Sequence, residues 1–109
     1  MVFIELSSFV AFRDEHWNDD EFRRFQAALM QSPKSGDVIR SGGGLRKLRW
    51  LAQRRGKRGG ARIIYYFQDA KAQIYLIYGY VKSERDDLTP DQVRTLAKLM
   101  TDMKESDHG

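Results

Sequence analysis

The chain has 109 residues, of which 41% are hydrophobic and 31% charged, and its formal net charge is +4 at pH 7. This size and balance exclude a disordered chain and indicate one domain, over residues 1–109, that can bury a core without disulfides. The absence of cysteine excludes thiolate metal sites. His16 and His108 lie too far apart in sequence to favour a histidine metal site. We therefore expect a protein without metal or cofactor and, since no apolar run is long enough to span a membrane, a cytoplasmic one.

The first elements follow from alternation and capping. Residues 1–6 alternate as a short strand does. Ser7 or Ser8 suits the N-cap of a short helix, because a serine hydroxyl can accept a hydrogen bond from an unpaired helix amide. Asn18 and Glu21 then form a capping box for a second helix.

The second helix is predicted to end near Gln31. Pro33 causes this, because proline disfavours helical backbone at the residue before it. Residues 37–44 contain a glycine triplet and are predicted to be a loop or a partial strand.

Three strands are predicted next, at 45–51, 61–67 and 74–81. The middle strand is rich in β-branched and aromatic residues and has apolar residues on both faces. This pattern is typical of a central strand that is covered on both sides. The short polar link at 68–73 suits a hairpin.

The last helix has the clearest start signal. Thr89 and Gln92 form a capping-box pair, and Pro90 occupies the first helical position. Residues 105–109 are expected to be a disordered polar tail. The order β-α-α-β-β-β-α predicts an α+β fold, with a small antiparallel sheet, two N-terminal helices and one C-terminal helix.

The basic residues are concentrated between residues 37 and 68. This segment holds nine basic residues against one acidic residue, a net charge of +8, whereas residues 1–36 and 69–109 each have a net charge of −2. The nine are Arg40, Arg46, Lys47, Arg49, Arg54, Arg55, Lys57, Arg58 and Arg62. Such a local patch favours recognition of phosphate groups.

Three motifs resemble those of the RelE/HigB toxins of bacterial type II toxin–antitoxin systems. They are G-G-L-R-K-L-R at 43–49, G-K-R-G-G-A-R-I-I-Y-Y-F at 56–67 and Y-V-K-S-E-R-D-D-L-T at 80–89. The resemblance covers nearly the whole chain and is strongest to the HigB-like branch, whose antitoxin is a helix-turn-helix protein. It implies a RelE-like fold and an endoribonuclease that enters the ribosomal A site and cuts translated mRNA. It also implies a protein antitoxin that blocks the site. Operator DNA would be contacted only indirectly, through the antitoxin, and no membrane partner is implied.

RNA can be cut without a metal when the 2′-hydroxyl attacks the neighbouring phosphate. The reaction needs a base, an acid and charge stabilisation at the phosphate. Arg62 is the first candidate, because a guanidinium held on the central strand can bind two phosphate oxygens. The resembled family carries an arginine at the matching place. The alternative is an arginine at the strand edge in a surface ion pair.

Lys57 and Lys82 are the candidates for proton transfer or charge stabilisation. Lys57 stands among Arg54, Arg55 and Arg58, and a lysine crowded by cations has a lowered pKa. The alternative for Lys57 is a solvated loop charge.

Lys82 lies in the Y-x-K-x-E part of the third motif. Its alternative is an ion pair with Glu84 or Asp86. Several RelE relatives have a basic residue where this chain has Ser83, so the general acid is left unassigned.

Further residues are assigned to RNA binding. Arg46, Lys47 and Arg49 suit contacts with backbone phosphates. On a strand Lys47 and Arg49 share a face, whereas Arg46 points the other way, which favours a solvated or antitoxin-facing charge there. Tyr66 shares a face with Arg62 and suits base stacking. The loop residues Arg54, Arg55 and Arg58 complete the set.

Two functions of other classes stay open. The chain could be a non-catalytic module that binds RNA or the ribosome, or a co-repressor subunit that acts only when bound to its antitoxin. The basic patch does not separate these from a nuclease. Inhibition of translation with mapped 5′ ends would.

Overall fold

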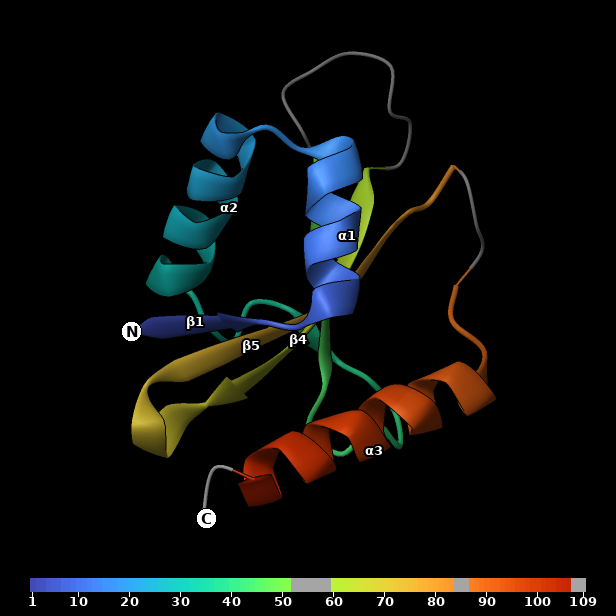
Figure 1. The fold of residues 1–109 in the computed structure, drawn as a ribbon. Helices are drawn as coiled ribbons and strands as arrows, with labels where there is room; N and C mark the ends of the chain where they lie inside the picture. The colour runs from blue at the N-terminus through green and yellow to red at the C-terminus, as the bar shows by residue number, and fades with distance from the viewer. Residues whose placement is uncertain (52–59, 84–86, 107–109) are drawn as a thin grey trace.

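A computed structural model describes residues 1–51, 60–83 and 87–106, which form a five-stranded sheet with helices on both faces (Figure 1). The strands are β1 (Val2–Glu5), β2 (Asp37–Val38), β3 (Arg46–Trp50), β4 (Ala61–Gln68) and β5 (Gln73–Val81). The helices are α1 (Ser7–His16), α2 (Asp19–Gln31) and α3 (Pro90–Ser106), with a 3₁₀ turn, η1 (Asp69–Lys71), between β4 and β5. The predicted α+β class is confirmed.

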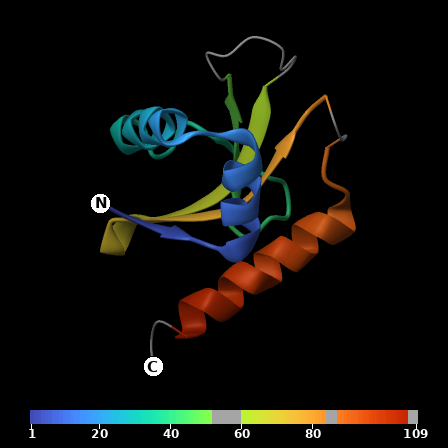
Figure 2. The same cartoon turned by 45° about the horizontal axis from the view of Figure 1, so that its top comes forward.

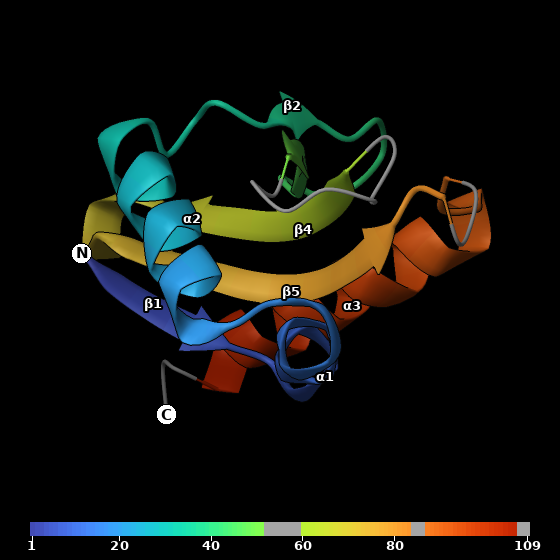
Figure 3. The same cartoon turned by 90° about the horizontal axis from the view of Figure 1, so that it is seen from above.

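The sheet has the order β1-β5-β4-β3-β2, which places β4 at its centre as predicted. Figure 3 shows β1, β5 and β4 side by side. The pairs formed by β2 to β5 are antiparallel. β1, however, runs parallel to β5, so the sheet is mixed and the prediction of an antiparallel sheet is wrong for β1. In the chain β1 is followed by two helices and not by another strand. No hairpin therefore connects β1 to a neighbouring strand and makes it antiparallel.

Two apolar clusters cover the two faces of the sheet. The first includes Phe9, Phe12, Phe25, Leu29, Ile63 and Tyr65, and it packs under α1 and α2. The second includes Leu45, Ile64, Tyr75, Ile77 and Met100, and it packs under α3. Because neighbouring strand residues point to opposite faces, Ile63 and Ile64 belong to different clusters. In Figure 2 α3 lies on the side of the sheet away from α2.

Two predicted helix starts are confirmed. The Asn18 side chain accepts a hydrogen bond from the Glu21 amide at 2.8 Å. At the start of α3 the Thr89 hydroxyl accepts from the Gln92 amide at 3.1 Å, and the Gln92 side chain accepts from the Thr89 amide at 2.8 Å. Both bonds of that capping box form, which fixes where α3 leaves the preceding segment.

The first and last helices differ from the predictions at their ends. Leu6 occupies the N-cap of α1, and the Ser8 hydroxyl instead donates to the Ile77 carbonyl on β5, so the predicted serine cap is wrong. The Ser8 hydroxyl thus bonds to the sheet and does not cap an amide of α1. At the other end, α3 continues to Ser106. Residues 105 and 106 are therefore helical and not part of a disordered tail, while residues 107–109 lie outside the described residues.

β5 carries an irregularity near its middle. Ile64 of β4 pairs with Tyr78, but the next residue, Tyr65, pairs with Leu76, so Ile77 is extra in the ladder. Ile77 and Tyr78 consequently both face the cluster under α3. This shift decides which face the last residues of β5 present.

Tyr65 ties the sheet to the loop that precedes β2. Its ring is fully buried, and its hydroxyl accepts from the Gly36 amide at 2.9 Å and donates to the Pro33 carbonyl at 2.8 Å. Burial raises the pKa of the Tyr65 hydroxyl, which stays protonated and able to donate. Tyr65→Phe would leave both backbone groups without this partner, so we expect it to lower the free energy of unfolding by about 1–3 kcal/mol. Urea denaturation measures the loss, and an unchanged midpoint would contradict it.

Candidate functional site

Four basic side chains gather at one end of the sheet face that α3 covers. The pairing register places Arg49 of β3 beside Arg62 of β4, and Arg62 beside Tyr80 of β5. Lys47 precedes Arg49 by two residues and shares its face, while Lys82 directly follows β5. We call Lys47, Arg49, Arg62 and Lys82 the cationic cluster.

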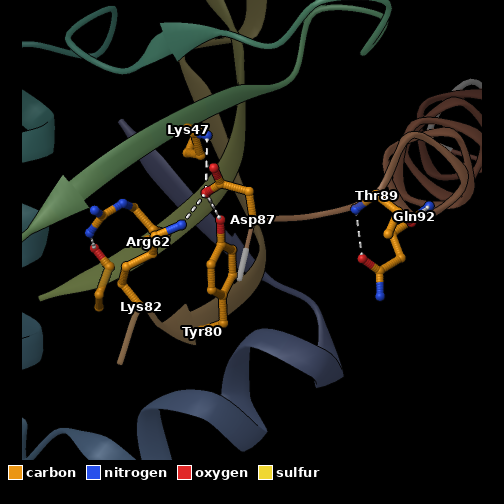
Figure 4. A network of polar contacts seen from close by, with 8 residues as sticks. Lys47, Arg62, Tyr80, Lys82, Asp87, Thr89 and Gln92 are labelled. Carbon is orange, nitrogen blue, oxygen red and sulfur yellow. Dashed lines mark hydrogen bonds and ion pairs between the residues drawn. The ribbon is translucent and has the colours of Figure 1, made fainter. Parts of the chain in front are cut away.

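The carboxylate of Asp87, from the segment just before α3, lies against this cluster (Figure 4). One oxygen, Oδ1, lies 3.0 Å from Lys82 Nζ and 3.7 Å from Lys47 Nζ. The Tyr80 hydroxyl donates to the same oxygen at 3.3 Å. The hydrogen bond from Lys82, and then the charge of Lys47, lower the pKa of the Asp87 carboxyl below its ordinary value. Asp87 is therefore ionised at neutral pH.

Arg62 occupies the rigid position that the sequence predicted. It lies on the central strand, with paired backbone on both sides, and its side chain is half-buried. One guanidinium nitrogen, Nη1, lies 3.5 Å from the Ala61 carbonyl oxygen. Arg62 pairs with Tyr80, and the Lys82 amide two residues further on donates to the Gly60 carbonyl two residues before Arg62, at 3.1 Å. The two leading catalytic candidates among the described residues thus share one small region.

Lys82 has a carboxylate partner, but not one of those expected. Glu84 and Asp86 lie outside the described residues, and the observed partner is Asp87. The sequence patterns did not indicate Asp87 or the Tyr80 hydroxyl as members of the site. Both residues lie within the motif at 80–89, and that shared motif was the only signal for them.

Arg46 is not part of the cationic cluster. As predicted, it points away from Lys47, on the face where Tyr65 is buried. Its guanidinium Nη1 donates to the carbonyl oxygens of Lys34 at 3.1 Å and Gly36 at 2.8 Å. Arg46 therefore holds the loop before β2 in place.

Tyr66 shares a face with Arg62 but lies at the other end of it. Its ring packs edge-on against Tyr75, with the centroids 6.4 Å apart. Lys104 Nζ from α3 lies 4.5 Å from the ring centroid and donates to the Tyr66 hydroxyl at 3.3 Å. The Lys104 ammonium therefore occupies one side of a partly exposed ring, and a base could stack on that side of Tyr66 only by displacing this lysine.

The loop candidates Arg54, Arg55, Lys57 and Arg58 fall in residues 52–59, outside the described residues, and their roles stay predictions. In the parts of the chain that are described, no three His, Asp or Glu side chains are grouped so that they could hold a metal ion. No helix in those parts is long and apolar enough to cross a membrane.

Comparison with known proteins places this chain in a family. Residues 9–108 match the family model of the RelE toxin of the RelE/RelB toxin–antitoxin system. The fold is similar to that of a mutant of Escherichia coli toxin RelE in the free state, with a TM-score of 0.58 and 12% identity over 91% of this chain and 95% of that chain. It is also similar to a chain of the intact E. coli RelBE toxin–antitoxin complex, with a TM-score of 0.52 and 12% identity over 72% of this chain and 92% of that chain. The predicted RelE-like fold is thereby confirmed and, since the family model matches most of its length, the chain belongs to the RelE toxin family.

Proposed function

We propose that this chain is the toxin of a type II toxin–antitoxin pair and that it cuts translated mRNA in the ribosomal A site. Membership of the RelE toxin family supports the first part. The observation that carries the second part is the placement of Arg62 and Lys82 together at one end of a sheet face. Several fixed positive charges in one place suit a phosphodiester whose negative charge grows during reaction.

In the proposed reaction the RNA 2′-oxygen attacks the adjacent phosphorus and the bond from phosphorus to the 5′-oxygen breaks. The products carry a 2′,3′-cyclic phosphate and a 5′-hydroxyl, and no metal ion takes part. Arg62 binds the non-bridging oxygens, where its planar fork can donate two parallel hydrogen bonds.

Lys82 acts as a second cation in this scheme. Its ammonium lies 3.0 Å from the Asp87 carboxylate, which shows that an anion can reach it, and contact with an anionic phosphate is the role proposed for it here. Lys57 stays the candidate for proton transfer. Lys47 and Arg49 bind neighbouring backbone phosphates of the message.

We also propose a protein antitoxin of the helix-turn-helix type. The E. coli protein of similar fold is found in a toxin–antitoxin complex, which supports an antitoxin as partner here, while the helix-turn-helix type rests on the resemblance to the HigB-like branch. By covering the cationic cluster, the antitoxin would exclude RNA. Contact with operator DNA would be made by the antitoxin, and not by this chain.

Cleavage products from a translating extract test the proposal. We expect cuts within the codon that occupies the A site, mapped by primer extension. The downstream fragment should accept labelled phosphate from polynucleotide kinase without prior phosphatase treatment, because its 5′ end is a hydroxyl. A 5′-phosphate would contradict attack by the 2′-hydroxyl. Arrest of translation without any cut would favour the non-catalytic binding module, and no effect other than antitoxin-dependent repression would favour the co-repressor subunit.

A further inference from the structure

We propose, building on the proposed function, that Lys47, Lys82 and Tyr80 form a phosphate-binding subsite, which Asp87 fills in the free protein and from which an RNA phosphate displaces it. The ligand class is a phosphodiester anion. The subsite adjoins Arg62, which pairs with Tyr80 across β4 and β5. A backbone held at Arg62 would therefore present a phosphate oxygen to the subsite as well.

The geometry of the contact supports an anion site. Three groups from separate positions surround one oxygen of Asp87: the Lys82 ammonium at 3.0 Å and the Tyr80 hydroxyl at 3.3 Å, which are within donating distance, and the Lys47 ammonium, which forms a longer ion pair at 3.7 Å. A non-bridging phosphate oxygen accepts from the same kinds of donor. A phosphodiester also carries one negative charge, as the carboxylate does, so the exchange leaves the charge of the subsite unchanged.

The next residues along the chain hold Asp87 in position. Leu88 packs against the apolar cluster under α3. Thr89 and Gln92 then close the capping box that starts α3, as Figure 4 shows. With two anchors directly after it, the carboxylate is presented to the lysines by the fold itself.

The contact is also accessible enough to be exchanged. The Asp87 side chain is 59% exposed, whereas those of Lys47 and Lys82 are 35% and 33% exposed. Exposed ion pairs contribute little stability, because water solvates the separated charges well. An incoming phosphate therefore meets lysines that are already positioned and a carboxylate that can turn out into solvent. Asp87 thus weakens RNA binding without preventing it.

The test compares Asp87→Asn with Asp91→Asn, which makes the same change of charge at an exposed aspartate paired with Arg94 on α3. The probe is a short single-stranded RNA with 2′-O-methyl groups, which cannot be cut, and binding is followed by fluorescence anisotropy. We expect Asp87→Asn to bind roughly two- to fivefold more tightly than the wild type, as suits the loss of one competing exposed ion pair. Asp91→Asn should change affinity less. In a Lys82→Ala background the Asp87→Asn gain should disappear.

A second measurement separates this proposal from the proposed function. Inorganic phosphate is titrated into each protein while the backbone NMR signals of Lys82 and Tyr80 are followed. Saturation at lower phosphate for Asp87→Asn than for the wild type and Asp91→Asn would support the subsite even if the protein cut no message. Equal or weaker binding of both probes by Asp87→Asn than by Asp91→Asn would overturn it, including when ribosomal cleavage is intact. Circular dichroism checks folding, and Asp87→Ala repeats the comparison should the asparagine variant unfold.

Discussion

Induction of the wild-type protein should arrest growth, and replacing Arg62 by alanine should relieve that arrest. Arg62 is the one arginine of the cationic cluster on the central strand, with backbone pairing on both sides. A guanidinium fixed in this way can meet the charge that develops on the phosphate without first being reorganised. Loss of one such preorganised donor typically slows catalysis about 10²–10³-fold. Single-turnover cleavage of ribosome-bound message should show a decrease of that size.

Two further variants separate the geometry of Arg62 from its charge. Arg62→Lys keeps the positive charge but loses the fork, so its cleavage rate should lie between those of the alanine variant and the wild type. Arg94→Ala removes an exposed arginine on α3, which is ion-paired with Asp91 away from the cluster, and should stay toxic. A folded Arg62→Ala protein with undiminished toxicity would remove Arg62 from the mechanism.

The fold was largely predictable because its signals are local. The apolar run of β4, the Asn18 cap of α2 and the capping box of α3 act within a few residues, and all three were placed correctly, although the Glu21 carboxylate accepts from Arg24 and Trp50. The parallel pairing of β1 was missed because it depends on contacts between residues about seventy positions apart, such as Val2 with Gln73. No short-range pattern encodes that choice.

The site was predictable only where charge and strand alternation sufficed. Lys47 and Arg49 share a face as alternation requires, and Arg62 lies on the central strand. The shared contact of Tyr80 and Lys82 with Asp87 was not predictable. The extra residue in β5 reverses the alternation beyond Ile77, which brings Tyr80 to the face of Arg62, and strict period-two counting from Tyr75 would place it on the other face.

Arg46 has a second role that the sequence did not indicate. Arg46 belongs to the basic segment by sequence, yet it is used to bind two carbonyl oxygens of the loop before β2. The Gly36 carbonyl belongs to a buried residue and obtains a donor from this guanidinium, whereas the Lys34 carbonyl belongs to an exposed one. A basic side chain in the patch is therefore not automatically available to RNA.

Without ribosomes, cleavage of the same message should fall by several orders of magnitude. The cationic cluster supplies positive charge. A lysine with the reference pKa of about 10.4 is mostly protonated near neutral pH, so it is a poor base there. The barrier must then be lowered chiefly by holding the 2′-oxygen in line with the bond that breaks, and positioning of this kind can supply roughly 7–11 kcal/mol. The ribosomal A site is the partner proposed to hold the message in that geometry. Primer extension on free and ribosome-bound message measures the ratio of the two rates.

The same mechanism predicts a specific effect of Lys82→Ala on cleavage by the ribosome-bound protein. If Lys82 stabilises charge at the reacting phosphate, its loss should lower the single-turnover rate on ribosomes by about tenfold or more while changing ribosome affinity only a few-fold. Lys98→Ala, which removes an exposed lysine on α3, is the matched control and should leave both quantities near those of the wild type. A Lys82→Ala protein that loses affinity and rate in equal measure would make Lys82 a binding residue. Efficient cutting of free RNA at the same positions would remove the ribosome from the mechanism, because the protein alone would then be orienting its substrate.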